Sequence, residues 1–334
     1  MKKILVVGAG GFAGGFIVEE GLRRGYKIWA GVRESTSRVY LEDPGINFVV
    51  FDFDNPESIA DTLKASLPEG EKWDWIIYNL GATKALSFAD FSRINYDYLR
   101  NFIKALKENS MMPEKFLYMS SLSVMGKGDE KGYTPFNEKM TPAPDTKYGA
   151  SKLKAEMLLL MEGVPFIIFR PTGIYGPRDK DYFLMFKSIA RGWDFSAGLR
   201  RQMLTFIYVE DLAKAIYDAL EKAPTGETYI ISEKRSYSQK EFRSIAREIM
   251  GKKFVLPVRL PLWIVKIVSA VAEKWGVARM KPSTLNRDKY NIMRQRNWNA
   301  DTEKASRDFG FSPETDLKEG VKKSINWYKE QGWL

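Results

Sequence analysis

Short apolar runs alternate along the first half of the chain with longer segments whose apolar residues recur every three or four positions. The apolar runs predict strands over 3–10, 27–32, 47–54, 74–82, 115–124 and 166–176. The periodic segments predict helices over 14–25, 58–66 and 91–109, and one that contains Tyr148. Strands and helices in this alternation form βαβ crossovers. The pattern therefore predicts an α/β fold with a doubly wound parallel sheet covered by helices on both faces.

Beyond about residue 175 the alternation loosens, and aromatic residues and prolines become more frequent. We expect a nucleotide-binding domain of residues 1–174 plus about 205–222. Residues 175–204 and 223–334 are expected to form a smaller, mostly helical substrate-binding domain at the carboxyl edge of the sheet, where such folds bind ligands. The most apolar run, residues 260–272, is short for a membrane span and contains Lys266, so it predicts a buried or interfacial helix.

The composition removes several kinds of chemistry. The 334 residues include no cysteine and no histidine, which excludes disulfides and the ligands that most zinc and transition-metal sites need. We expect no metal site. Histidine cannot act as a base, so any proton transfer must use Tyr, Lys, Asp, Glu or a hydroxyl group. Hydrophobic residues at 44% and charged residues at 28% are ordinary for a globular protein.

The net charge of +10 is spread along the chain, with acidic residues interleaved and no basic block. This distribution does not favour nucleic-acid binding; it is typical of a solvated surface or of a chain that attracts an anionic cofactor or substrate. The apolar stretch after Met1-Lys2-Lys3 is short and soon interrupted by glycines, unlike a secretory signal. We expect a cytoplasmic location and a small-molecule substrate.

The first predicted strand runs into "VVGAGGFAGGF", which places Gly8, Gly11 and Gly14 at GxxGxxG spacing around Phe12. Glycines between a strand and a helix allow a tight turn and close approach of a pyrophosphate to the helix N-terminus. The position of the motif at the start of a βαβ unit favours dinucleotide binding over a purely structural turn. Asp52 ends the third strand and is a candidate partner of the adenine amino group, although a helix cap or turn explains it nearly as well.

Tyr148 precedes Lys152 by four positions in "DTKYGASKLKAE". Residues i and i+4 share a helix face, and a nearby cation lowers a tyrosine's pKa from its usual value of about 10. Such a pair suits proton exchange with an alcohol or ketone. In isolation the same spacing more often indicates an exposed pair on an amphipathic helix, because such pairs occur by chance in many helices.

Four motifs in order resemble the extended short-chain dehydrogenase/reductase family: the glycine motif, "YMSSLSVMG" (118–126), the Tyr148–Lys152 pair and "RPTGIYGPRD" (170–179). The resemblance covers essentially the whole chain. Within the family, the chain resembles the NAD(P)-dependent epimerases and dehydratases, and the nearest branch looks like the dihydroflavonol reductases and 3β-hydroxysteroid dehydrogenases. It implies a Rossmann-type fold, a homodimer, and Tyr148 as acid/base. Lys152 would lower the tyrosine's pKa and hold the nicotinamide ribose. Ser121 would bind the substrate oxygen, with Ser123 as the lesser alternative.

The resemblance also nominates cofactor contacts. Val32 stands where NAD-preferring members carry an acid, and Arg33 follows it, so we expect NADP in preference to NAD. Ser35, Ser37 and Arg38 are candidate helpers. The stretch after the fourth strand and the end of the sixth strand complete the set: Leu80, Gly81, Ala82, Lys84, Pro171 and Gly173.

Three functions follow. The first is a reductase or dehydrogenase acting on a relatively apolar alcohol or ketone. The second is a nucleotide-sugar epimerase or dehydratase that keeps its NAD(P) tightly bound. The third is a redox-silent NADP-binding sensor or scaffold, which the intact Ser121, Tyr148 and Lys152 argue against. Met125 replaces a tyrosine that is common in the family, and Tyr98-Leu99 stand where Gly-Thr is frequent, so no specific substrate transfers by resemblance.

Overall fold

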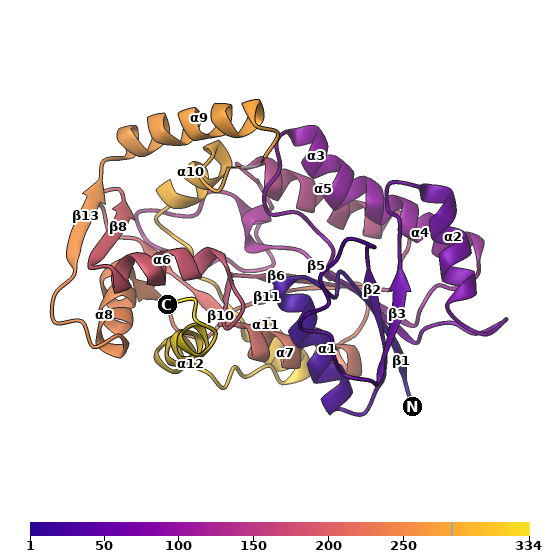
Figure 1. The fold of residues 1–334 in the computed structure, drawn as a ribbon. Coiled ribbons are helices and arrows are strands. Elements are labelled where there is room, and N and C mark those ends of the chain that lie inside the picture. Colours follow the sequence, from indigo (N-terminus) through magenta and orange to yellow (C-terminus); the bar gives the residue numbers. More distant parts are fainter. Residues whose placement is uncertain (282) are drawn as a thin grey trace.

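The computed structural model describes residues 1–281 and 283–334 and is organised around a seven-stranded parallel sheet (Figure 1). The strand order is β11-β6-β5-β4-β1-β2-β3, so the direction of winding reverses between β1 and β4. A crevice opens at the carboxyl ends of the strands where such a reversal occurs. This topology confirms the predicted doubly wound α/β fold. The strands are β1 (Lys3–Val7), β2 (Lys27–Val32), β3 (Ile46–Val50), β4 (Trp75–Tyr78), β5 (Lys115–Met119), β6 (Phe166–Pro171) and β11 (Glu227–Ile231).

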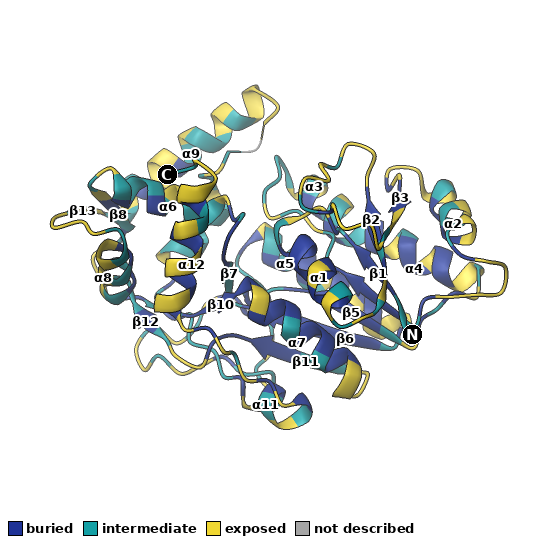
Figure 2. Cartoon of the chain, turned by 60° about the horizontal axis from the view of Figure 1, so that its bottom comes forward, coloured by how far each residue is buried: buried dark blue, intermediate teal, exposed yellow. Residues whose placement is uncertain are grey.

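Helices cover both faces of this sheet, because each face carries a continuous apolar core. One core joins the sheet to α1 (Phe12–Arg23), α7 (Val209–Lys222) and α11 (Glu303–Phe309). The other joins it to α2 (Pro56–Ala65), α4 (Tyr98–Glu108) and α5 (Lys147–Met161). Figure 2 shows the buried residues concentrated in the strands and on the inward faces of these helices.

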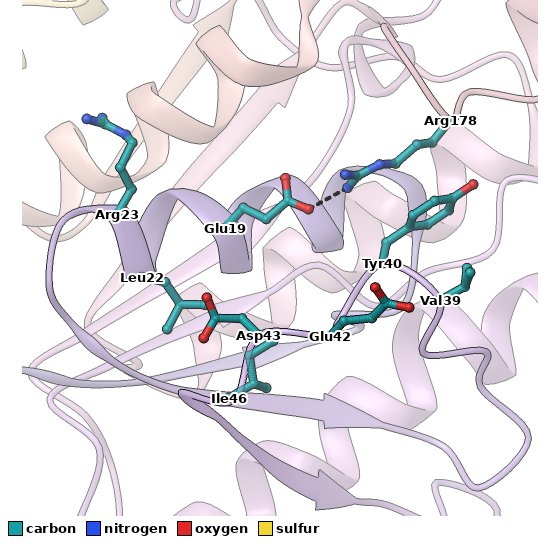
Figure 3. Close-up of a pocket in the computed structure, with 9 residues that line it drawn as sticks. All are labelled: Glu19, Leu22, Arg23, Val39, Tyr40, Glu42, Asp43, Ile46 and Arg178. Atoms are coloured by element: carbon teal, nitrogen blue, oxygen red, sulfur yellow. Dashed lines mark hydrogen bonds and ion pairs between the residues drawn. The ribbon is translucent and has the colours of Figure 1, made fainter. Parts of the chain in front are cut away.

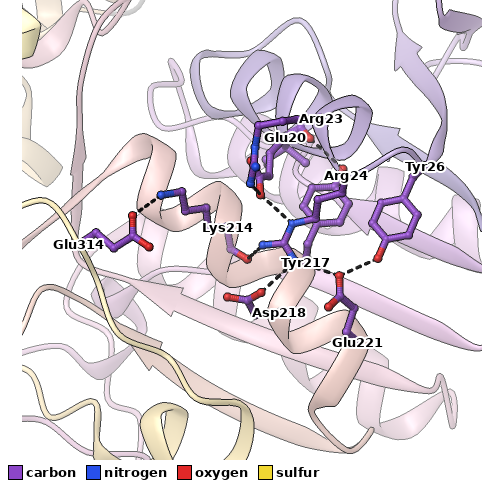
Figure 4. A network of polar contacts seen from close by, with 10 residues as sticks. Glu20, Arg23, Arg24, Tyr26, Lys214, Tyr217, Asp218, Glu221 and Glu314 are labelled. Carbon is purple, nitrogen blue, oxygen red and sulfur yellow. Dashed lines mark hydrogen bonds and ion pairs between the residues drawn. The ribbon is translucent and has the colours of Figure 1, made fainter.

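A polar network on the outer surface fixes α1 against α7 (Figure 4). The Arg24 guanidinium contacts Glu20 at 2.7 Å, and Asp218 and Glu221 at 2.9 Å each. The Tyr217 hydroxyl donates a hydrogen bond to the Ile17 carbonyl at 2.8 Å. These contacts hold the helix that follows the glycine turn in a defined position on the sheet.

The sequence defines several of the element boundaries. The Asn55 side chain accepts a hydrogen bond from the Ser58 amide and Pro56 follows it, so α2 begins there. Thr146 caps α5 in the same way through the Gly149 amide. Gly310, with φ of 78°, ends α11 in the left-handed conformation that glycine adopts without strain.

The helix expected over 91–109 is not continuous. It consists of α3 (Phe88–Ser92), a π-helical turn (Arg93–Asp97) and α4. The strand expected over 115–124 ends at Met119, and a 3₁₀ turn (Leu122–Met125) follows, because the Ser121 side chain accepts a hydrogen bond from the Ser123 amide. The strand expected over 166–176 divides into β6 and β7 (Gly173–Tyr175).

The second region is built from α6 (Asp181–Ala190), α8 (Gln239–Ile249) and α12 (Leu317–Glu330), which share an aromatic-rich core. The expected boundary at residue 223 does not match the sheet, since β11 pairs with β6 and places Glu227 beside Ile167. Three two-stranded sheets complete the region: β7 with β10 (Phe206–Tyr208), β9 (Met203–Leu204) with β12 (Tyr237–Ser238), and β8 (Trp193–Ala197) with β13 (Leu256–Leu260).

The apolar run expected to form a buried or interfacial helix is α9 (Leu262–Ala278), which lies on the outside of the molecule beside α10 (Arg287–Arg294) (Figure 1). Only Val265 and Ser269 of this helix are buried. The expectation of a buried helix is therefore wrong. The expectation of an interfacial helix is compatible with this exposed position. Of the helices in the described residues, none has both the length and the apolar character that a membrane crossing needs.

Candidate active site

The glycine turn between β1 and α1 forms a cradle for a phosphate group. Gly8 has φ of 84°, and its amide donates to the Gly31 carbonyl at 2.9 Å. Gly11 is the N-cap of α1; among the described residues no side chain caps this helix end, and its first turn carries no acid. The free amides and the helix dipole at this end favour an anion. The turn therefore fits the pyrophosphate of a dinucleotide.

Side chains larger than glycine would close this cradle. A Cβ on Gly14 would lie 2.3 Å from the Gly8 carbonyl oxygen, and one on Gly8 would lie 2.8 Å from the Leu80 amide nitrogen. These contacts bring the glycine turn against the start of the loop after β4. Phe12 begins α1 and packs edge-on against Phe16, with ring centroids 6.1 Å apart. The structure thus brings together the residues that the motif predicted for the pyrophosphate.

The loop after β2 lies across the glycine turn. Val32, at the end of β2, is buried and places no carboxylate there. The Arg33 amide and carbonyl both bond with Thr36, whose methyl group would meet a Cβ on Gly10 at 2.1 Å. Arg33 itself is exposed; burial and the Asp54 carboxylate raise the pKa of Tyr98 to about 12, and the charges of Arg93 and Arg33 oppose this rise. The Arg38 guanidinium lies 4.4 Å from the centroid of the Phe48 ring.

The two aspartates after β3 differ in their contacts. Asp52 is exposed and accepts a hydrogen bond from the Asp54 amide at 3.1 Å, which is the turn geometry that the alternative interpretation anticipated. Asp54 pairs with Arg93 at 2.7 Å and accepts a hydrogen bond from the Tyr98 hydroxyl. Asp52 is thus left facing solvent at the edge of the sheet, whereas Asp54 is engaged.

Tyr148 lies in the first turn of α5, directly against the 3₁₀ turn that carries Ser121. A Cβ on Gly149 would lie 2.4 Å from the Ser123 carbonyl oxygen, so the glycine permits this approach. The Tyr148 amide donates to Asp288 of α10 at 3.0 Å. The phenyl ring of Phe91 lies 6.2 Å from the phenol ring, centroid to centroid. Tyr148 therefore lies between α3 and α10 and the 3₁₀ turn that follows β5.

Burial dominates the protonation of the pair. It raises the pKa of Tyr148 to about 12, and a hydrogen bond with Ser121 opposes this rise. Burial also lowers the pKa of Lys152 to about 7, and the nearby Glu156 carboxylate opposes that change. Lys152 was expected to lower the pKa of Tyr148, but it does not do so here. Its ammonium group is bonded to the Met119 carbonyl instead.

The Lys152 ammonium donates to the Met119 carbonyl at 2.8 Å and lies 4.8 Å from the centroid of the Tyr118 ring. A Cβ on Gly81 would lie only 2.9 Å from its nitrogen. Gly81 and Lys152, predicted separately as cofactor contacts, are thus neighbours. The loop after β4 and α5 meet at the carboxyl ends of β4 and β5.

Asn95 links these two segments and was not among the predicted site residues. It is fully buried; its amide oxygen accepts from the Ala82 amide at 2.7 Å. Its amide nitrogen donates to the Ala82 carbonyl at 3.1 Å and to the Ser151 hydroxyl at 2.9 Å. Ser151 in turn donates to the Tyr148 carbonyl at 2.7 Å. The only sequence signal was an asparagine within an otherwise regular helical pattern.

A buried ion pair supports the site from behind. Arg170 and Glu156 form two hydrogen bonds, of 2.6 and 3.1 Å, and both are almost fully buried. The Ser120 hydroxyl donates to the same carboxylate. Ser120 is thus engaged with this pair. Arg170 also contacts the sulfur of Met125 at 3.3 Å.

The remaining predicted contacts lie at the border with the second region. Lys84 forms an ion pair with Asp181 of α6 at 2.5 Å, so its ammonium is engaged with α6. Pro171 ends β6 beside Ile231 of β11. A Cβ on Gly173 would lie 2.3 Å from the Tyr182 hydroxyl, so a larger residue here would require the tyrosine side chain to move.

A pocket of about 560 Å³ lies elsewhere, between α1 and the loop before β3 (Figure 3). Arg178 enters it from the second region, pairs with Glu19 at 2.7 Å and lies 4.4 Å from the centroid of the Tyr40 ring. The predicted catalytic and cofactor-binding residues do not line this pocket. We therefore place the candidate active site by the convergence of motifs and not by this cavity.

Known proteins of several activities resemble this chain over nearly its whole length. Ceramide reductase of Caulobacter vibrioides is 23% identical over 332 residues, covering 99% of this chain and 96% of the relative. UDP-glucose 4-epimerase of Vibrio cholerae is 22% identical over 339 residues, covering 97% and 94%. The solved structure of UDP-glucuronic acid 4-epimerase from Bacillus cereus in complex with NAD has a TM-score of 0.76 at 20% identity, covering 98% and 99%.

The family model for the NAD-dependent epimerase/dehydratase family matches residues 4–232, from the first strand through the glycine turn and α5 to β11. The match confirms the expected kinship at the level of the family and the dependence on a nicotinamide dinucleotide, whereas the dihydroflavonol reductase branch stays a prediction. This chain belongs to the NAD-dependent epimerase/dehydratase family and is an enzyme of the extended short-chain dehydrogenase/reductase type.

Proposed function

We propose that this enzyme is an NAD(P)-dependent reductase or dehydrogenase that exchanges a hydride with an alcohol or ketone, with Tyr148 as acid/base. One observation carries the proposal. The Tyr148 phenol lies near enough to Ser121 for this hydroxyl to oppose the rise in its pKa, and it lies one helical turn from Lys152, beside the glycine-lined edge of the sheet. A chain without histidine has few other groups that transfer protons, and here a phenol and a hydroxyl are placed together.

In this mechanism the nicotinamide, when bound, donates or accepts the hydride. Ser121 holds the substrate oxygen by a hydrogen bond. Tyr148 donates its proton to that oxygen as the carbonyl is reduced and takes it back in the opposite direction. Because burial raises its pKa to about 12, the phenol is protonated at neutral pH and has a proton to donate to a carbonyl oxygen.

Lys152 and Asn95 position the cofactor in this proposal. The Lys152 ammonium faces the loop that contains Gly81, where it can donate to the hydroxyls of the nicotinamide ribose. Asn95 holds Ala82 of the same loop through two hydrogen bonds. The glycine turn would bind the pyrophosphate, with Asp52 at the adenine end.

Two features support an apolar substrate. The Phe91 ring flanks the phenol of Tyr148, and Met125, where a tyrosine is common in the family, is buried at the end of the 3₁₀ turn. Among the similar proteins, the Caulobacter vibrioides relative is named as a reductase. We infer a homodimer from the family resemblance alone, and we separately propose a cytoplasmic location.

We further propose that NADP is preferred over NAD. Val32 leaves the end of β2 without a carboxylate to repel a 2′-phosphate, and the exposed Arg33 follows it. Burial raises the pKa of Tyr98, and the charges of Arg93 and Arg33 both oppose this rise, so two cations act at this corner of the sheet. A guanidinium makes charge-assisted, bidentate bonds to a phosphate.

A nucleotide-sugar epimerase or dehydratase is the second candidate. It is favoured by the relatives and solved structures that carry such activities in their names, including a dTDP-glucose 4,6-dehydratase from Bacillus anthracis in complex with NAD. Such an enzyme retains its dinucleotide through purification and shows no net consumption of NADPH. A reductase exchanges the cofactor freely and consumes it in proportion to substrate.

The test is a screen of NADPH and NADH oxidation against a panel of ketones and nucleotide sugars, with Tyr148→Phe as the variant. We expect turnover to fall about 10²–10⁴-fold while cofactor binding is retained. Tyr133→Phe is the matched control, because it removes an exposed phenol that donates to the Arg201 carbonyl at 2.9 Å. Near-normal activity of Tyr148→Phe would refute the assignment, and turnover of sugars without net NADPH loss would select the epimerase.

A further inference from the structure

The outer face of α9 carries a continuous apolar stripe. Trp263, Ile267, Val271 and Trp275 follow one another at four-residue spacing, so they share one side of the helix. Each is at least half exposed, with relative exposures of 65%, 55%, 55% and 62%. Monomeric proteins rarely leave contiguous apolar surface of this kind uncovered unless it binds a partner or a membrane.

The orientation of the helix is fixed by its opposite side. Val265 and Ser269 are buried, and α9 packs beside α10. Figure 1 shows α9 along the outer edge of the molecule, and Figure 2 shows exposed residues along it. The apolar stripe is therefore the solvent side of an anchored helix.

Further exposed apolar side chains precede and follow α9 in the chain. On the N-terminal side, β13 pairs with β8 and places Leu256 beside Trp193; the Trp193 and Phe195 rings lie 6.4 Å apart. All three side chains are exposed, as is Phe254 just before β13. On the C-terminal side, Met280 is 77% exposed. Exposed apolar residues thus occur along the chain on both sides of α9.

The same segment is strongly basic. Residues 251–281 contain one acid, Glu273, and seven cations: Lys252, Lys253, Arg259, Lys266, Lys274, Arg279 and Lys281. Glu273 is already engaged, since its carboxylate lies 3.6 Å from both Lys147 and Arg287. Lys266 and Lys274 are exposed on α9 next to the stripe.

We propose that α9 docks the enzyme flat on an anionic lipid bilayer. The stripe would enter the boundary between headgroups and acyl chains, with the two tryptophans at the interface where indole rings are favoured. Lys266 and Lys274 have flexible apolar stems that let their ammonium groups reach the phosphates. Each cation close to an anionic surface adds attraction.

The charge pattern argues against a second copy as the occupant. Two α9 faces brought together would place Lys266 and Lys274 of both copies at one interface, with no free acid from this segment to compensate. An anionic bilayer supplies the complementary charge on every side.

The docking also has a consequence for access, because α10 packs beside α9 and its Asp288 accepts from the Tyr148 amide. The membrane side of the enzyme would be the side of the catalytic helix.

Cosedimentation with vesicles tests the docking. We expect the intact protein to bind phosphatidylglycerol vesicles, to bind pure phosphatidylcholine vesicles much less, and to dissociate as salt is added. A cation near the surface contributes about fivefold in affinity, which corresponds to about 1 kcal/mol, so Lys266→Gln/Lys274→Gln should weaken binding about 25-fold. Trp263→Ser/Trp275→Ser should weaken vesicle binding about tenfold or more, because it removes the two indole rings that the bilayer interface would bury.

The matched control is Lys64→Gln/Lys104→Gln, which removes two exposed cations from α2 and α4 and should leave vesicle binding nearly unchanged. An equal loss in this control would overturn the proposal, because diffuse positive charge would then explain the binding. Absence of binding to phosphatidylglycerol at low salt would also overturn it. Sedimentation velocity adds a third outcome: a dimer that Trp263→Ser/Trp275→Ser dissociates, without vesicle binding, would identify a second copy as the occupant.

Discussion

Replacing Asn95 with alanine is the sharpest test of how the candidate site is assembled. The side chain is fully buried and makes three hydrogen bonds, two with Ala82 and one with Ser151. Asn95→Ala removes all three and leaves the Ala82 amide and carbonyl without these partners. The loop that carries Gly81 then loses its connection to the catalytic helix.

The magnitude follows from these contacts. A hydrogen bond contributes about 1 kcal/mol net, so the loss is about 3 kcal/mol in the free energy of unfolding. At about 2.1 cal/mol/K per residue, the unfolding entropy of this 334-residue chain is about 0.7 kcal/mol/K, which predicts a decrease in Tm of about 4 °C. Reordering one freed backbone residue on cofactor binding costs about 1–2 kcal/mol, which corresponds to about a tenfold weaker affinity for NAD(P).

Thermal unfolding and cofactor titration by fluorescence measure both quantities. Asn109→Ala is the matched control, because this asparagine at the end of α4 donates one hydrogen bond to the Ala60 carbonyl at 2.9 Å, away from the site. It should lower Tm by about a third as much and leave cofactor affinity unchanged. If Asn95→Ala lowers Tm as predicted but binds the cofactor normally, Asn95 has only a structural role and the reasoning about the loop is refuted.

Three further predictions follow from the same geometry. Arg33→Ala should weaken NADP binding about ten- to hundredfold and barely change NAD binding; equal losses in parallel titrations would contradict the NADP preference. Burial lowers the pKa of Lys152 to about 7 from 10.5, so the unfolded chain holds the extra proton between these values. The free energy of unfolding should therefore rise from pH 7 to 10.5, by at most about 5 kcal/mol, and Lys152→Met should remove this rise in denaturant titrations. Gly149→Ala would bring a Cβ to 2.4 Å from the Ser123 carbonyl and displace Tyr148, so kcat should fall about a hundredfold while cofactor affinity is retained; unchanged kcat would show that the helix start can adjust.

The sequence by itself determined the features that depend on neighbouring residues. Alternating apolar runs and helical periodicity defined the parallel sheet and most of its helices, because strand and helix periods are properties of local side-chain order. The glycine turn was predictable for the same reason, since Gly8 needs a positive φ and Gly14 needs a close backbone approach within one short segment. The spacing of Tyr148 and Lys152 likewise placed both residues on α5.

Only the tertiary structure decided the features that depend on distant partners. β11 joined the sheet through pairing with β6, some sixty residues away in sequence, which no local pattern specifies. The direction of the Lys152 ammonium was decided by the Met119 carbonyl, and the pKa of Tyr148 by burial among several elements. The apolar run 260–272 is compatible with a core helix as well as with a surface helix. Its outward face on α9 was decided by what packs against Val265 and Ser269, because burial is a property of the assembled chain and not of the segment.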